Sequence, residues 1–361
     1  MKDKAISIFN FIGLGFFEPA VRLASGEEVN KNLNELIRKV VFPLVSILLF
    51  LFVWHFGSQA LYNIERNYKI EVAKESGGET AVTAELARIE SGESTINALP
   101  SPGSVFVAFK TLIEDHRVIS AKKDAFAEKV AATNKKRKAK GLAAITYTGR
   151  PSFVDQVLTS LKTVTAGFFL ALFLAVPIGM VLGLSETLRS SFNWLIQIFK
   201  PVSPVVWFLL VYMIVKSLTL TYDGDVSFII SFIAVGLCAM WATLINTTLG
   251  VSTVENDYLN VAKVLNLSVG QKVFKIILPS AFPLIFTGLR ITVSVAWMVL
   301  IAIELLSQSP GLGTFVWEEF QNGANDSNAK IIAAMFVIGG IGFLLDRIMF
   351  SVQKLMTFTE A

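Results

Sequence analysis

The chain has 361 residues, of which 53% are hydrophobic and only 17% are charged, and its mean hydropathy is +0.60. This composition is too apolar and too poor in charge for a soluble protein of this length. The single cysteine, Cys238, excludes an internal disulfide and a cysteine-based metal cluster, and the two histidines, His55 and His116, stand far apart without evident partner ligands. We therefore expect an all-α membrane protein without a bound metal or cofactor.

Apolar runs along the chain predict about six transmembrane helices. A spanning helix needs about 20 apolar residues to cross roughly 30 Å of hydrocarbon. The runs that approach this length cover residues 40–56, 163–184, 192–218, 226–250, 282–306 and 331–350. Pro201 and Pro204 are expected to kink the third span, which makes it either a moving element or a statically bent one. The segment Ser104–Ile113 is too short to cross and is expected to form an interfacial or re-entrant helix.

Charges beside the spans predict that both termini lie in the cytoplasm. Arg38 and Lys39 flank the first span as they would in a retained anchor, and the segment before it does not resemble a cleaved signal peptide. Arg347 and Lys354 accompany the last span. The acidic loops 219–225 and 307–329 are then expected outside, and the loops 185–191 and 251–280 inside.

The long first loop is expected outside although it is partly basic, because loops of this length translocate largely regardless of charge. It has a Glu-rich part, a Leu-Pro-Ser-Pro turn at Leu99–Pro102, and an insertion at 115–149 with the basic cluster Lys135–Lys140. That cluster is either a solvated helix face or a docking surface for an external partner or anionic lipid headgroups. Nucleic acid is not expected as a partner on that side of a membrane.

These expectations give the domain organisation. It comprises a cytoplasmic segment (1–39), the first span (40–56), a periplasmic loop (57–156), a core with a cytoplasmic loop at 251–281 (157–355), and a cytoplasmic tail (356–361).

The inner loop has the pattern of an amphipathic helix. Val261, Val264 and Leu265, followed by Val269, Val273 and Ile276, recur at roughly helical spacing. Asn256 and Asp257 are suited to cap the start of this helix, and Pro279 is expected to break it before the next span. Such a helix is able to seat in a groove of a soluble subunit, or to lie on lipid headgroups as a plain connector.

The stretch from Tyr258 to Pro279 resembles the EAA loop of ABC importer permeases, in which Glu-Ala-Ala is followed four residues on by Gly and then by Ile-x-Leu-Pro. The matching positions are Asn260, Val261 and Ala262, then Asn266, and finally Ile276, Leu278 and Pro279. Two residues depart from the pattern, because Asn260 stands in place of the acidic residue and Asn266 in place of the glycine. The resemblance implies that these residues contact an ATPase.

The likeness extends over most of residues 99–355. Leu99–Pro102, Thr159–Gly183, Thr287–Glu304 and Pro310–Gly313 are similar to the nitrate, sulfonate, taurine and bicarbonate permease family. Four further stretches look most like nitrate-type members: Tyr147–Gln156, Ile198–Pro204, Leu244–Thr247 and Trp317–Gly323.

The resemblance implies a type I ABC importer permease with a MetI-like fold. Two copies would form the pore, two cytoplasmic ATPases would bind the inner loops, and a binding protein would deliver an anion from outside. The sequence has no Gly-x-x-x-x-Gly-Lys-Ser/Thr phosphate loop, so the chain is not expected to be an enzyme that hydrolyses ATP itself. Many ion-coupled carriers have ionisable residues in the middle of their spans and paired internal repeats. Neither feature is evident in this sequence, so a partner ATPase is the favoured source of energy.

Lys200 and Arg290 are candidates for an anion path, because a small oxyanion that loses water needs donors or positive charge. Alternatively, both side chains are expected to extend to the membrane–water interface. For Arg290, an ion pair with Asp346 is a further alternative. Glu304 is expected to be hydrogen-bonded among helices. Three glycines of the second span are expected to allow close packing: Gly167, Gly179 and Gly183.

The leading hypothesis is ATP-driven import of a small oxyanion, most favourably nitrate. Uptake of a sulfonate, taurine, bicarbonate or cyanate by the same mechanism is the alternative within transport. A membrane scaffold that recruits a signalling protein through the inner loop is the alternative from another class.

Overall fold

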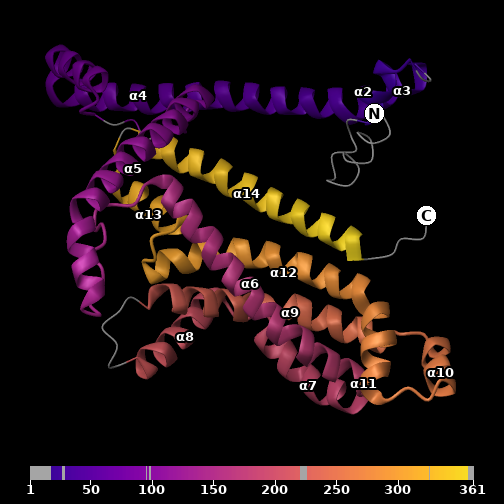
Figure 1. Cartoon of the computed structure of the whole chain (residues 1–361). Helices are drawn as coiled ribbons and strands as arrows, with labels where there is room; N and C mark the ends of the chain where they lie inside the picture. Colours follow the sequence, from indigo (N-terminus) through magenta and orange to yellow (C-terminus); the bar gives the residue numbers. More distant parts are fainter. Residues whose placement is uncertain are drawn as a thin grey trace. The chain divides into compact units, whose positions relative to one another are not determined.

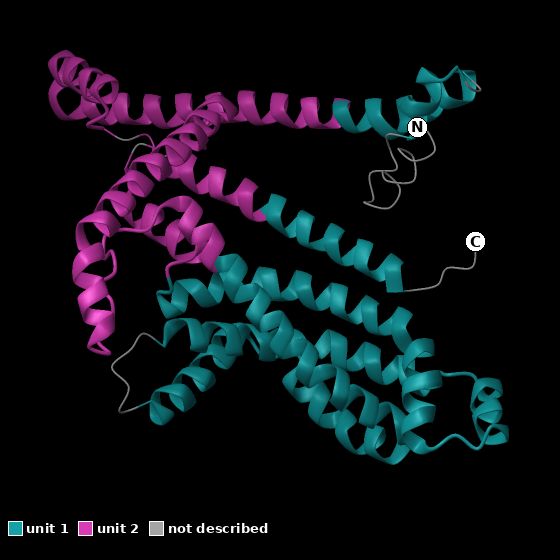
Figure 2. Cartoon of the chain, viewed as in Figure 1, with its two compact units in different colours: residues 1–44, 160–309, 339–361 teal, residues 45–159, 310–338 magenta. Residues whose placement is uncertain are grey.

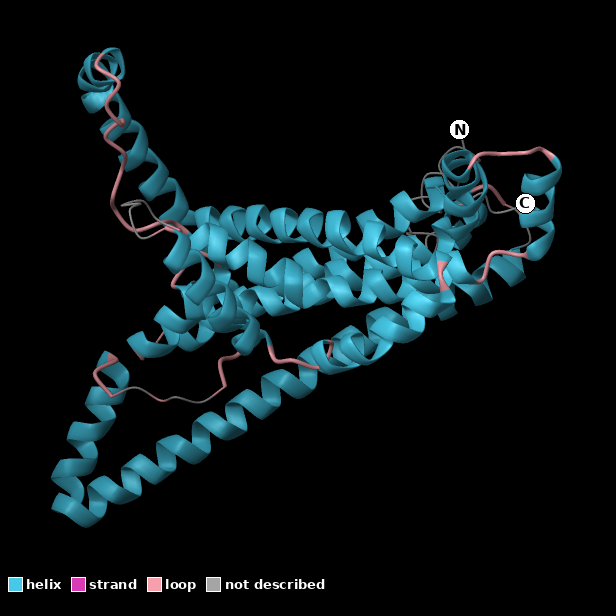
Figure 3. Ribbon diagram, turned by 90° about the horizontal axis from the view of Figure 1, so that it is seen from below, coloured by secondary structure: helices cyan, strands magenta, loops and turns pink. Residues whose placement is uncertain are grey.

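The computed structural model describes residues 18–26, 29–94, 96, 99–219, 226–324 and 326–356, and every regular element in these ranges is helical (Figures 1 and 3). The all-α prediction is therefore confirmed. The elements are α2 (Glu18–Ala24), α3 (Val29–Leu36), the π-helical turn η2 (Ile37–Val41), α4 (Phe42–Ser91), α5 (Pro102–Ala139), α6 (Phe153–Leu184), α7 (Glu186–Phe199), α8 (Pro204–Leu218), α9 (Ser227–Ser252), α10 (Asn256–Val264), α11 (Val269–Lys272), the π-helical turn η3 (Val273–Ile277), α12 (Leu278–Ser307), α13 (Leu312–Asn322) and α14 (Ser327–Met356).

Five helical stretches are long and apolar enough to cross a membrane: 29–91, 153–184, 227–252, 269–307 and 327–356. The bent pair α7 and α8 brings the number to six if it is counted as one span. Each predicted apolar run falls within one of these stretches or within the bent pair, except that Val226 precedes the stretch 227–252 by one residue. Asp223 and Asp225 of the acidic loop 219–225 lie outside the described residues, as do residues 1–17 and 357–361 of the two terminal segments.

The chain divides into two compact units (Figure 2). Unit 1 comprises residues 1–44, 160–309 and 339–361, and unit 2 comprises residues 45–159 and 310–338.

The core of unit 1 depends on glycines where α6, α9 and α12 meet. A Cβ atom at Gly179 of α6 would lie 2.7 Å from Cβ of Thr247 and 2.9 Å from the carbonyl oxygen of Leu244, both on α9. On α12, a Cβ atom at Gly288 would lie 2.9 Å from Cα of Thr243. Gly167 and Gly183 of α6 make equally close approaches to α9. The close packing expected of the three α6 glycines is therefore present.

Buried hydroxyl groups add polar contacts to this core. The Thr292 hydroxyl of α12 donates to the Ala239 carbonyl of α9 at 3.1 Å, and it accepts from the Thr243 backbone N–H at 3.2 Å. The two threonine hydroxyls lie 2.7 Å apart. Because no water is present in hydrocarbon to satisfy such groups, bonds of this kind hold neighbouring spans in one register.

The third predicted span is not one continuous helix. α7 ends at Phe199, α8 starts at Pro204, and the two are bent by 100°. Pro201 and Pro204 both lack a backbone N–H, so a kink was expected, but the bend is far larger than a proline kink. Trp241 of α9 stacks on Phe199 with ring centroids 6.3 Å apart and contacts Trp207 at 6.2 Å, so aromatic rings fill the corner.

In unit 2, two helices extend far beyond the predicted elements. The predicted first span, 40–56, is part of a helical stretch that continues to Ser91, with non-helical backbone only at Gly77 and Gly78. The segment Ser104–Ile113 is not a short helix, because α5 runs from Pro102 to Ala139. Both predictions were too short for the same reason: apolar periodicity ends early, whereas Ala, Glu and Lys, which favour helices, continue.

The C-terminal end of the predicted first span is fixed within unit 2 by one tryptophan. Trp54 Nε1 donates to the Pro100 carbonyl at 3.0 Å, and its ring stacks on Phe336 of α14 at 5.6 Å. Ser101 then caps α5 by accepting from the Ser104 backbone N–H, with Pro102 in the first turn.

Substitution of Gly179 by alanine is expected to force α6 away from α9 and to destabilise the protein by about 1–3 kcal/mol, the usual range for overpacking. Thermal unfolding of the detergent-solubilised protein measures this as a lower midpoint. Gly340→Ala is the matched control, because a Cβ atom there meets open space. Equal midpoints for the two variants would contradict the packing role of Gly179.

Candidate functional site

The inner loop forms a compact helix-turn-helix between α9 and α12. α10 ends in a Schellman turn, in which the Leu267 N–H donates to the Ala262 carbonyl at 3.1 Å and the Asn266 N–H donates to the Lys263 carbonyl at 3.0 Å. The next helical segment begins with a capping box, since Ser268 accepts from the Gln271 N–H while the Gln271 side chain accepts from the Ser268 N–H. The two caps fix the geometry of the loop.

Asn266 occupies a left-handed backbone position, with φ of 48°. Most residues are strained there, whereas Gly adopts it freely and Asn is the commonest substitute. The departure from the glycine of the resembled motif is therefore conservative in backbone terms. Both residues allow the turn that closes α10.

Apolar side chains of α10 and its turn point into solvent. Val264 is 80% exposed, Leu265 62% and Val261 52%, and Tyr258 is also exposed. Asn260 is exposed beside them. An exposed apolar patch of this kind, rimmed by polar residues, is typical of a protein or membrane contact.

Ala262 is only 2% exposed, so its side chain faces the loop's own interior. Leu259 packs against a buried cluster formed by α9, η3 and α12. The cluster comprises Val251, Ile277, Ala281, Ile285 and Leu289. These five cluster residues anchor the loop, and the resemblance to the EAA loop did not single them out. The capping box was also missed, although its Ser-x-x-Gln pattern is visible in the sequence.

Two local predictions at the ends of the loop are wrong. Glu255, whose side chain makes no capping bond, occupies the N-cap of α10, so Asn256 and Asp257 lie within its first turn. Pro279 does not break the helix, because residues 269–307 are continuously helical. The π-helical turn Val273–Ile277 precedes it, and its wider winding accommodates a proline ring that would clash in a regular α-helix. Ile276 and Leu278 are half-buried beside the exposed Pro279.

The charged residues considered for the anion path are not gathered in one place. Arg290 of α12 makes a bidentate pair with Asp346 of α14, with Nε to Oδ1 at 2.5 Å and Nη2 to Oδ2 at 2.8 Å. Glu304 is completely buried and accepts from the Ser160 hydroxyl at 2.6 Å. Lys200 is exposed at the C-terminal cap of α7, at the corner with α8.

A groove of about 450 Å³ runs along α12 beside the Arg290–Asp346 pair. Its lining residues Thr287, Ser294 and Met298 share one helix face with Ile291. The guanidinium group in this lining is paired with Asp346, so the groove carries no net charge.

A second cavity, with a volume of about 760 Å³, lies in unit 2. Hydroxyl and amide groups from α4, α5 and α14 line it, among them Ser58, Asn63 and Ser104, and its charged lining residue is Asp326. Without a cationic group in this lining, the cavity is poorly suited to an anion. Among the described residues, moreover, no group of three His, Cys, Asp or Glu side chains is placed to hold a metal ion.

Comparison with known proteins gives the chain its family. The sequence profile described as "Binding-protein-dependent transport system inner membrane component" matches residues 175–357. The nitrate import permease protein NrtB of Synechococcus elongatus is 35% identical over 202 residues, which cover 56% of this chain and 69% of that protein. The bicarbonate transport system permease protein CmpB of Synechocystis is 37% identical over 202 residues, 56% of this chain and 68% of that protein.

A third relative comes from a different bacterial group. The taurine transport system permease protein TauC of Escherichia coli is 30% identical over 225 residues, 59% of this chain and 75% of that protein. With the multiple apolar helices and the geometry of the inner loop, these matches show that the chain belongs to the inner-membrane permease subunits of binding-protein-dependent ABC importers.

Proposed function

We propose that this chain forms the transmembrane pathway of an ATP-driven importer for a small oxyanion and that its inner loop is the docking site of a cytoplasmic ATPase. The observation that carries the proposal is the exposed apolar patch of α10, defined by Tyr258, Val261, Val264 and Leu265. A patch of this composition fits a groove of a soluble subunit.

The loop is built to transmit force as well as to bind. Its two caps fix its shape, and the buried cluster below it joins it to α9 and α12. A movement of the docked ATPase therefore reaches the spans through a rigid body. ATP hydrolysis is assigned to that partner, the termini to the cytoplasm, and the second half of the pathway to another copy of this chain.

Nitrate is the proposed cargo because four stretches of the sequence are similar to nitrate-type permeases. They are Tyr147–Gln156, Ile198–Pro204, Leu244–Thr247 and Trp317–Gly323. Bicarbonate, a sulfonate, taurine or cyanate would cross by the same mechanism, since the external binding protein selects the substrate.

Deletion of this chain is expected to abolish growth of the cells on low nitrate as the sole nitrogen source and to leave growth on ammonium unchanged. Uptake of labelled nitrate measures the same loss directly. Normal nitrate uptake combined with lost uptake of bicarbonate or a sulfonate would assign a different cargo to the same importer.

Val264→Glu is expected to weaken ATPase association at least about tenfold, because a charge in the apolar patch must be desolvated on docking. Recovery of the ATPase with the purified permease measures the loss. Gln271→Glu is the matched control, since it adds the same charge nearby and keeps the capping box. Ala262 is unsuitable as a probe because its burial would make any bulky substitution disrupt the loop itself.

Asn266→Gly is expected to keep coupled transport, whereas Asn266→Val places a β-branched residue at a φ of 48°. The left-handed conformation costs such a residue about 1–2 kcal/mol, so the Schellman turn should open. Faster hydrogen exchange at the Leu267 amide, together with ATP hydrolysis that no longer drives uptake, is the expected readout. Equal exchange in both variants would show that the turn does not depend on this position.

A further inference from the structure

The insertion 115–149 is a folded arm rather than an irregular loop. It consists of the second half of α5 and the extended segment 142–151, which runs back along it. Asn134 of α5 bonds to the backbone of Ile145 in both directions, at 3.0 Å and 2.7 Å, and Arg137 Nε donates to the Ala143 carbonyl at 2.7 Å. Phe126 meets Tyr147 edge to face at 5.7 Å. One face of the helix is therefore covered by its own return segment.

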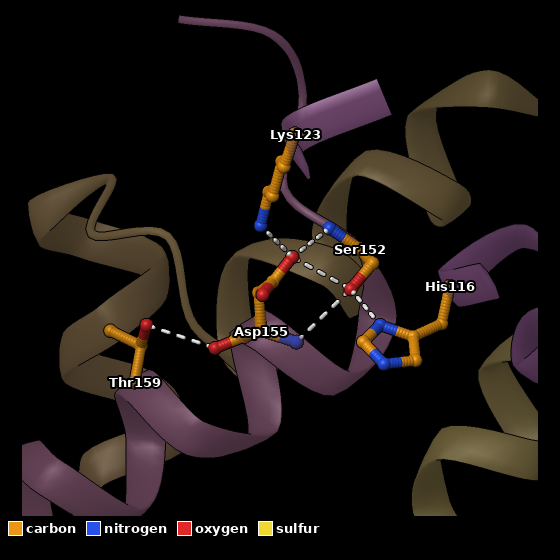
Figure 4. A network of polar contacts seen from close by, with 5 residues as sticks. All are labelled: His116, Lys123, Ser152, Asp155 and Thr159. Carbon is orange, nitrogen blue, oxygen red and sulfur yellow. Dashed lines mark hydrogen bonds and ion pairs between the residues drawn. The ribbon is translucent and has the colours of Figure 1, made fainter. Parts of the chain in front are cut away.

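The base of the arm is fixed to the first turn of α6 (Figure 4). Ser152 and Asp155 cap α6 reciprocally: the Ser152 N–H donates to Asp155 Oδ2 at 2.8 Å, and the Asp155 N–H donates to Ser152 Oγ at 3.2 Å. Two side chains of α5 join this cap, Lys123 by donating to Asp155 Oδ2 at 2.5 Å and His116 through Nδ1 at 2.8 Å from Ser152 Oγ. The arm therefore holds a fixed direction relative to the start of α6.

A line of lysines occupies an exposed face of the helix beside the return segment. Lys122, Lys129 and Lys136 are spaced seven residues apart and so lie on one line along the edge of the covered face, where Lys122 and Lys129 stand one turn to either side of the half-buried Phe126. The end of the arm is the most basic part, with no acidic residue from Lys129 to Gly149. Its basic residues are Lys129, Lys135, Lys136, Arg137, Lys138 and Lys140.

The composition of this face favours a water-soluble partner over the membrane. A helix that binds a bilayer surface inserts Trp, Phe or Leu below the headgroups. From residue 121 to residue 139, the exposed positions of α5 carry only Ala, Lys, Asp, Glu and Thr. The helix face therefore supplies positive charge without an apolar anchor, and the exposed apolar side chains of the arm, Leu142 and Ile145, belong to the return segment. From Lys122 to Lys140 the helix face extends about 27 Å, close to the diameter of a small domain.

We propose that this lysine face is a docking surface for an acidic side of the soluble binding protein that delivers substrate outside the membrane. The proposal rests on the proposed function, which places the arm outside. This surface affects the association rate. A rigid basic surface attracts an acidic partner over several ångströms and so raises that rate, and added salt screens the attraction.

The test uses the permease with its ATPase in nanodiscs of neutral phosphatidylcholine and the binding protein of the same transporter. The variant carries Lys129→Glu, Lys136→Glu and Lys140→Glu together. Its association rate at low salt is expected to fall at least about tenfold and to approach the wild-type rate at high salt. The matched control carries arginine at the same three positions, which keeps the charge, and is expected to associate like the wild type.

Equal association rates for the glutamate variant and the wild type in neutral nanodiscs would overturn the proposal. A difference that arises only when anionic phosphatidylglycerol is added would overturn it too, because the arm would then bind lipid headgroups. ATP hydrolysis at saturating binding protein, measured in the same samples, separates the two hypotheses. Stimulation of the wild-type complex supports the proposed function whatever the arm does, and its absence counts against that function itself.

Discussion

The fold of unit 1 depends on how closely the backbones of its spans approach one another. Lipid chains are as apolar as leucine, so helices in a bilayer gain little from hiding apolar side chains and associate through packing and hydrogen bonds. The glycines at 167, 179 and 183 let α6 lie directly on the backbone of α9, and Gly288 does the same for α12. At that distance the threonine hydroxyls of α9 and α12 bond directly. The resulting stack is the rigid support of both the inner loop and the groove along α12.

On that support, the inner loop combines an apolar outer face with a fixed backbone. Val264 and Leu265 are exposed, while Ala262 is buried and Leu259 packs against the cluster around Ile277. Asn266 and Asn260, the two residues that depart from the EAA pattern, have different consequences. Asn266 keeps the left-handed turn that a glycine would make, so the shape of the loop is retained. Asn260 is exposed, so the loss of an acidic group there changes the chemistry offered to a partner rather than the fold.

The sequence was sufficient to predict where the apolar runs form helices, because runs of about 20 apolar residues have few other uses, but not the 100° break that divides the third run into α7 and α8. Close packing at the α6 glycines and the Arg290–Asp346 pair were also accessible, since small residues and isolated charges in spans have few stable environments. The extent of α4 and α5 was not accessible, because Ala, Glu and Lys favour helices without periodicity that marks their ends. The continuity of the helix through Pro279 depends on a π-helical turn for which the sequence carries no evident signal. The burial of Ala262 was not accessible either, because it depends on how the loop packs in three dimensions.

The uninterrupted helix from Val269 to Ser307 has a mechanical consequence. Its 39 residues make one rod of about 58 Å, which begins at the inner loop and carries the groove face on its own surface. A flexible joint at Pro279 would have absorbed torsion, but a continuous rod passes it on. Twisting the end at the inner loop by a few degrees therefore turns Thr287, Ser294 and Met298 by a similar angle, so the groove face reorients with the loop without any change within the helix.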